Sequence, residues 1–125
     1  MSLNPEKYLA LVTLLEQLRS DATTTQIAAP ELRRRVASLQ QFFGQQIVPL
    51  ADVGEPSLQG EDSRVQSYQT EMSKQLRLLE IDVMFFQGAR QASTAQTRLQ
   101  TISDRLTTLI QYCNAILQPE AEGEK

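Results

Sequence analysis

Over residues 61–118 the chain reads EDSRVQSYQTEMSKQLRLLEIDVMFFQGARQASTAQTRLQTISDRLTTLIQYCNAILQ, and this stretch decides the fold. It contains no proline and one glycine, Gly88, and it is rich in the good helix formers Gln, Leu, Arg, Glu and Ala. Apolar residues recur three and four positions apart on both sides of Gly88, which is the spacing of one helix face. The two predicted faces are Val65, Tyr68, Met72, Leu76, Leu79, Val83 and Phe86, then Ala95, Leu99, Ile102, Leu106, Leu109, Cys113 and Ile116.

Gly88 leaves two interpretations open. The chain can turn at residues 88–94, with Gly88 as a C-terminal cap and Ser93 or Thr94 capping the next helix. Alternatively, one helix runs through the whole stretch, with a length of about 85 Å. We favour the turn, because a chain this short rarely gives half its length to a single rod.

A shorter helix is expected at the start of the chain. Asn4 suits an N-cap and Pro5 the first helical position, and apolar residues then follow at helical spacing. We expect this helix to end near Ser20, because the β-branched run at residues 23–25 favours other conformations.

A second short helix is expected to begin at Ala29-Pro30-Glu31. Pro49 should stop it, since proline lacks an N–H and clashes with the preceding turn. Residues 50–60 have loop composition. The predicted fold is therefore all-α, an antiparallel four-helix bundle with two shorter N-terminal and two longer C-terminal helices. Residues 1–119 form a single domain and residues 120–125 a disordered acidic tail.

The unequal helix lengths predict an uncovered apolar surface. By helix rise, the later pair is about 10–15 Å longer than the earlier pair. Exposed apolar patches usually mark interfaces, and a second copy is the simplest cover, so we expect a homodimer. The side chains predicted for this surface are Ile81, Met84, Phe85 and Phe86.

Charge and hydropathy exclude several classes of protein. The net charge is −3, and residues 120–125 hold three of the 15 acidic and one of the 12 basic residues, which leaves 12 against 11 in the body. Without a basic excess, no nucleic-acid binding is expected. Apolar runs reach about four residues where a membrane span needs about 20, so no membrane insertion is expected. No secretory signal is visible, and we expect a soluble cytoplasmic protein.

Catalytic, metal and cofactor chemistry is also disfavoured. The chain has no histidine, and its one cysteine, Cys113, occupies a core position and is expected to be a buried structural thiol. Helical di-metal sites use Glu-x-x-His pairs, which cannot occur here. The acidic loop at residues 52–62 lacks the ligand spacing of a calcium site. We expect no catalytic residues, no metal, no cofactor and no enzyme.

Two groups of side chains are candidates for binding a partner. Arg33, Arg34 and Arg35 spread around a helix, so they form either a solvated face or a docking site for an acidic segment. Of two adjacent phenylalanines on a helix, such as Phe85 and Phe86, one can enter the core while the other lies at a rim. An acidic partner segment would suit the arginines, and an apolar anchor would suit the phenylalanines.

Four segments resemble a known family: SLNPEKY at residues 2–8, LLEQLRSD at 14–21, APELR at 29–33 and LQQFF at 39–43. With the chain length and the long later helices, they resemble the cyanobacterial PatD family of heterocyst frequency control proteins. The resemblance implies a non-enzymatic regulator that binds the cell-division protein FtsZ and influences how often vegetative cells of filamentous cyanobacteria become heterocysts. The alternative is a general helical scaffold or assembly factor that binds another protein through the exposed surface of the third and fourth helices.

Overall fold

The computed structural model describes residues 5–24, 27–47 and 60–118, and every regular element in these ranges is a helix. The elements are α1 (Pro5–Thr24), α2 (Ala29–Phe42), the π-helix η1 (Phe43–Ile47), α4 (Gly60–Gly88) and α5 (Ala92–Leu117). No strand occurs within these ranges, so the all-α prediction is confirmed. Asn4, Pro49, Pro119 and the predicted acidic tail lie outside the described residues.

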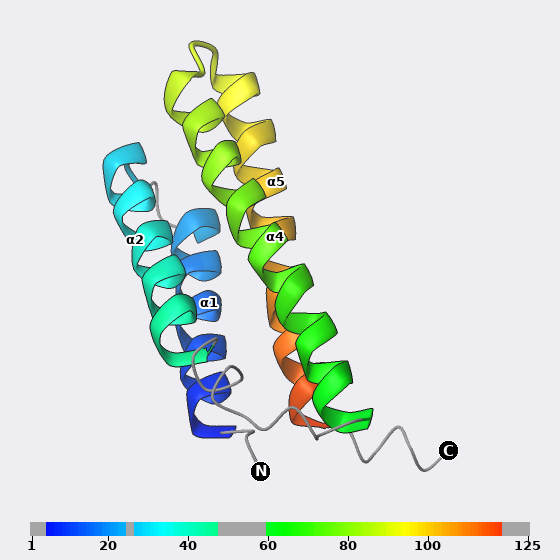
Figure 1. The fold of residues 1–125 in the computed structure, drawn as a ribbon. Coiled ribbons are helices and arrows are strands. Elements are labelled where there is room, and N and C mark those ends of the chain that lie inside the picture. Colours follow the sequence, from blue (N-terminus) through cyan, green and yellow to red (C-terminus); the bar gives the residue numbers. More distant parts are fainter. Residues whose placement is uncertain (1–4, 25–26, 48–59, 119–125) are drawn as a thin grey trace.

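The helices run alternately up and down along one long axis (Figure 1). α4 and α5 form a long hairpin, α1 packs mainly against α5, and α2 packs mainly against α4. Because α4 has 29 residues and α1 only 20, the hairpin extends beyond the shorter helices at its closed end. The predicted difference in length between the two pairs is therefore confirmed.

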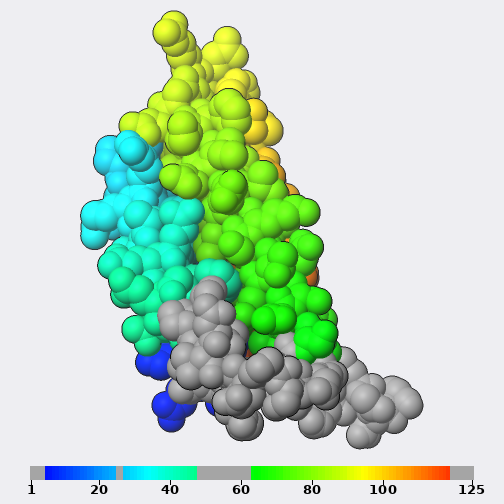
Figure 2. Space-filling view, in the orientation of Figure 1, coloured from blue at the N-terminus to red at the C-terminus, as the bar shows by residue number. Residues whose placement is uncertain are grey.

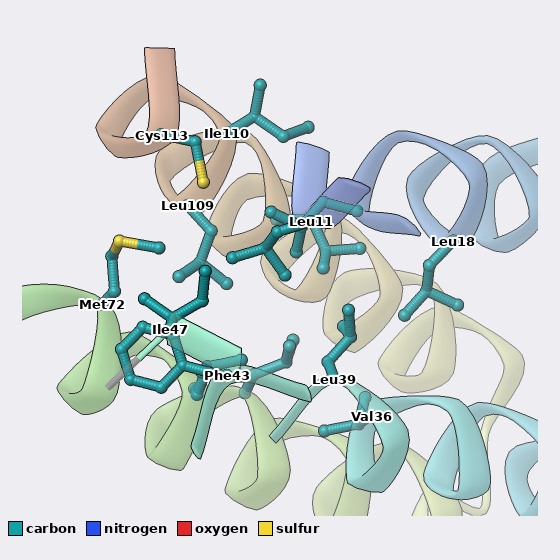
Figure 3. Close-up of a cluster of buried hydrophobic side chains, with 14 of the residues drawn as sticks. Leu11, Leu18, Val36, Leu39, Phe43, Ile47, Met72, Leu109, Ile110 and Cys113 are labelled. Carbon is teal, nitrogen blue, oxygen red and sulfur yellow. The ribbon is translucent and has the colours of Figure 1, made fainter. Parts of the chain in front are cut away.

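One hydrophobic core joins the four helices and η1. Side chains from α1, α2, η1, α4 and α5 converge on it (Figure 3). The two apolar faces predicted on either side of Gly88 supply the part of the core that comes from α4 and α5. Of these residues, Val65, Tyr68, Phe86 and Leu99 are only partly buried at its edge, and Ala95 lies outside it. The fully buried large side chains include Leu11, Leu15, Leu18, Leu32, Val36, Ile47, Met72, Leu79, Ile102, Leu106, Leu109 and Ile116.

The predicted turn after Gly88 is confirmed, but its caps differ from the prediction. α4 ends at Gly88, whose φ lies outside the left-handed region, so it is not a left-handed glycine cap. α5 begins earlier than expected, because Gln91 adopts an extended conformation and its carbonyl accepts the Ala95 N–H at 3.0 Å. The N-cap residue of α5 is therefore Gln91, and the predicted capping by Ser93 or Thr94 is wrong. Gln91 makes no side-chain cap hydrogen bond.

Gly88 is also open to substitution. A β-carbon at this position would meet no atom within 4 Å. Since alanine has the higher helix propensity, Gly88→Ala should raise the free energy of unfolding by about 0.5 kcal/mol. Urea denaturation of both proteins measures this, and a loss of stability would show that the turn depends on glycine.

α1 continues past the predicted end at Ser20. Thr23 and Thr24 lie in its last turn, and their hydroxyls donate to the carbonyls of Arg19 (2.9 Å) and Ser20 (2.6 Å). Ala22 is buried and extends the apolar face by one turn. Tertiary burial therefore outweighs the weak helix propensity of the threonines.

The second helix is not regular to its end. Its last described turn widens into η1, where Phe43 and Ile47 are both buried. Gln46, on the same turn, accepts a hydrogen bond from the Lys7 ammonium of α1 at 2.7 Å. A π-turn therefore joins the end of α2 to the first turns of α1, where the sequence predicted an uninterrupted α-helix.

Candidate functional site

The closed end of the α4–α5 hairpin carries an exposed apolar ridge. Ile81, Met84 and Phe85 lie on one face of α4, with 40%, 58% and 53% of their surfaces exposed. We call these three residues the outer ridge. Figure 2 shows this end of the molecule, in yellow-green and yellow, standing above the cyan side chains of α2. The exposure predicted for Ile81, Met84 and Phe85 is confirmed, whereas Phe86, predicted for the same surface, is partly buried against the core.

The two neighbouring phenylalanines have different surroundings. Phe86 is half-buried and packs against the core, whereas Phe85 points outward. The guanidinium of Arg98, from α5, lies over the Phe85 ring, 4.5 Å from its centroid. This cation–π contact holds one face of the ring and places a positive charge beside the outer ridge.

The three consecutive arginines of α2 also differ from one another. Arg34 pairs with Glu31 within α2, and Arg33 is exposed. Arg35 bridges to Asp21 of α1 at 2.8 Å, and its guanidinium holds the pKa of the Asp21 carboxyl below its usual range. Arg35 therefore joins two helices, while Arg33 is available to a partner.

The register of α2 against α4 brings Arg33 toward the outer ridge. The Gln40 side-chain amide donates to the Leu76 carbonyl and to Glu80, both at 3.3 Å. Seven residues are two helical turns, so Arg33 lies on the same side of α2 as Gln40. Because the helices are antiparallel (Figure 1), Arg33 lies about 10 Å closer than Gln40 to the closed end of the hairpin. Of the three arginines, exposed Arg33 is therefore the one directed toward the end of the molecule that carries the outer ridge.

A buried polar contact at the base of this end was not foreseen. Asp82 is buried and pairs with Arg105 of α5, which also donates to the Gln75 side chain at 3.3 Å. The pair fixes the register of α4 against α5 below the outer ridge. A signal existed in the sequence, because Asp82 follows Leu79 at the three-residue spacing of the buried face.

Cys113 is buried, as predicted. Its side chain lies among core residues of α5 and α4 (Figure 3), and this burial raises the thiol pKa to about 12. A thiolate at this position is therefore strongly disfavoured in the folded protein.

A thiol reagent such as Ellman's reagent should react with Cys113 only after the protein unfolds. Since the thiol ionises more readily in the unfolded chain, folding stability should also fall as the pH rises above the usual thiol range. Reaction time courses with and without urea measure the first effect. Immediate, complete reaction of the folded protein would contradict the burial.

The described part of the chain contains no group of three Cys, Asp or Glu side chains placed to hold a metal ion. The acidic loop at residues 52–62 lies outside the residues whose side chains are described.

None of the described helices is both long enough and apolar enough to cross a membrane. Comparisons with protein-family models, with curated proteins and with solved structures find no match for this chain.

Proposed function

We propose that this protein is a non-enzymatic regulator that acts by binding another protein through the closed end of its α4–α5 hairpin. The observation that carries the proposal is the outer ridge, where three large apolar side chains are exposed together on a helix end that extends beyond its neighbours. Contiguous exposed apolar patches commonly mark interaction sites, whereas apolar residues exposed singly need no such explanation. The buried Cys113 is in keeping with a role outside catalysis.

The partner we propose is the cell-division protein FtsZ, on the basis of the resemblance of residues 2–8, 14–21, 29–33 and 39–43 to the PatD family. In this role the protein would influence FtsZ assembly and heterocyst frequency in filamentous cyanobacteria. Different affinities for the FtsZ subunit and its polymer would decide the direction of the effect.

Biolayer interferometry with purified cyanobacterial FtsZ tests both parts of the proposal. We expect saturable binding that weakens about tenfold in Phe85→Ala, since aromatic anchors carry much of the energy of an interface. Leu9→Ala is the matched control, because Leu9 is exposed to a similar extent (55%) on α1. Absence of binding by the wild-type protein would exclude FtsZ, and equal binding by the two variants would exclude the outer ridge.

The competing proposal is a general helical scaffold or assembly factor that binds a protein other than FtsZ through the exposed surface of α4 and α5. Absence of FtsZ binding would favour it. The proposed homodimer is tested separately, by sedimentation equilibrium of the wild-type protein and of Phe85→Ala. A wild-type dimer that the substitution converts into a monomer would assign the outer ridge to a second copy.

A further inference from the structure

Four arginines, from three helices and the hairpin turn, lie toward the end of the molecule that carries the outer ridge. Arg98 of α5 lies over the Phe85 ring, and Arg33 of α2 lies two helical turns closer to the closed end than Gln40, which contacts Leu76. Arg77 is exposed one helical turn before Ile81, and Arg90 is exposed in the turn after α4. We call Arg33, Arg77, Arg90 and Arg98 the arginine rim.

Carboxylates are scarce at this end of the molecule. Residues 83–103 include two arginines and no aspartate or glutamate. Asp82 pairs with Arg105 and Glu31 with Arg34, whereas the exposed Glu80 and Asp104 accept hydrogen bonds from the neutral amides of Gln40 and Gln100 and keep their charge. The four arginines still outnumber Glu80 and Asp104, so the end is locally basic although the chain as a whole carries a net charge of −3.

We infer that the outer ridge and the arginine rim form a docking site for an acidic segment of a partner protein that carries an apolar anchor side chain. This inference rests on the proposed function and adds the chemistry of the segment that is bound. Interfaces commonly place an apolar anchor at their centre and charged groups at the rim, where complementary charge speeds encounter and selects the partner. The outer ridge would contact the apolar anchor of the segment, and the arginine rim would pair with carboxylates on either side of that anchor.

The same residues argue against other occupants. A second copy seated on this end would bring its own arginine rim against the first, and like charges placed together oppose association. The phosphates of a nucleic acid could bind the arginines, but exposed aliphatic side chains such as Ile81 and Met84 have no hydrogen-bond donor or charge to bind a phosphate. An acidic segment with an apolar anchor uses both groups.

Arg98 takes part in both interactions, because it contacts the aromatic ring of the outer ridge and carries a positive charge for the carboxylates of the segment. Its guanidinium carbon lies 4.5 Å from the centroid of the Phe85 ring, and the planar group has five N–H donors, so some can still bind a carboxylate. Lysine has no planar group to stack, so Arg98→Lys should retain only part of the binding, and Arg98→Gln should lose more. A role in charge alone would leave Arg98→Lys equal to the wild type.

A selection experiment tests the chemistry without knowledge of the natural partner. A phage-displayed library of random dodecapeptides is selected on the wild-type protein, and enriched peptides are measured by fluorescence polarisation. We expect peptides with an excess of Asp and Glu around a large apolar residue, and their binding should weaken with added salt. Phe85→Ala and Arg98→Gln should each weaken binding at least about tenfold. The matched controls are Leu9→Ala and Arg64→Gln, since Arg64 lies over the Tyr68 ring near the opposite end of α4, and each should change binding less than about twofold.

Several outcomes would overturn the inference. Neutral or basic peptides, or acidic peptides that bind Phe85→Ala and the wild type equally, would show that the site does not recognise this chemistry. A dodecanucleotide that binds at the outer ridge when no peptide does would assign the site to nucleic acid. A dimer dissociated by Phe85→Ala would assign it to a second copy.

The peptide and FtsZ experiments can fail separately. FtsZ binding that is lost in Phe85→Ala, without selection of acidic peptides, would leave the proposed function standing and remove the inference. Acidic peptides bound at the outer ridge, without FtsZ binding, would keep the inference and remove FtsZ as the partner.

Discussion

Leu106→Ala is expected to lower the free energy of unfolding by about 3 kcal/mol. Leu106 is completely buried on α5, within the core that all the helices share. The substitution removes apolar contacts and leaves a cavity, because surrounding helices relax only in part. Urea denaturation followed by far-ultraviolet circular dichroism measures the change. For a domain with a total stability of about 5–15 kcal/mol, this loss is large.

Leu9→Ala removes the same atoms from an exposed position on α1, where 55% of the leucine surface is accessible. We expect this control to cost less than about 1 kcal/mol, since little apolar area returns to water. Equal losses in the two variants would contradict the packing described for α5.

Asp82→Ala should cost about 2 kcal/mol, because it leaves the Arg105 guanidinium without its carboxylate at the packed α4–α5 interface. The expected loss lies below that for a fully buried pair, since about a quarter (26%) of the Arg105 side chain reaches solvent. The same denaturation experiment measures it. The exposed pair formed by Lys74 and Glu71 is the matched comparison, and Glu71→Ala should cost less than about 0.5 kcal/mol.

The double variant Asp82→Leu/Arg105→Met separates attraction within the pair from the cost of one uncompensated charge. If the charge left behind causes the loss, the double variant should recover most of the wild-type stability, as replaced buried ion pairs often do. A double variant that is less stable than Asp82→Ala would show instead that the pair is itself strongly stabilising.

The sequence predicted the helices because two independent signals gave the same helix positions over most of the chain. These signals were the spacing of the apolar residues and the positions of proline and glycine. Pro5, Pro30 and Gly88 lie at or next to helix boundaries, and most of the predicted faces are buried. Helix ends were less predictable, since they depend on tertiary burial. Ala22 keeps α1 helical beyond Ser20, and the widened turn at Phe43–Ile47 follows from packing that no local pattern reports.

The candidate site was predictable only in part. Helix lengths indicated that Ile81, Met84, Phe85 and Phe86 would be exposed, and three of these four side chains are. Arg98 was missed because its contact with Phe85 depends on the register across the hairpin turn.

Away from this site, the sequence also did not predict the buried Gln69, whose side-chain amide donates to the Tyr8 hydroxyl at 2.7 Å. The local sequence around a buried polar residue does not indicate which residue, 61 positions away, will bond to it.

α1 begins and α5 ends at the pole of the molecule opposite the hairpin turn (Figure 1). The 26 residues of α5 separate the two poles by about 39 Å. A sensor surface, fluorophore or fused protein joined to the chain before Pro5 or beyond Leu117 is therefore a handle at the far pole. A protein immobilised through either attachment point keeps the closed end of its α4–α5 hairpin accessible to binding partners in solution.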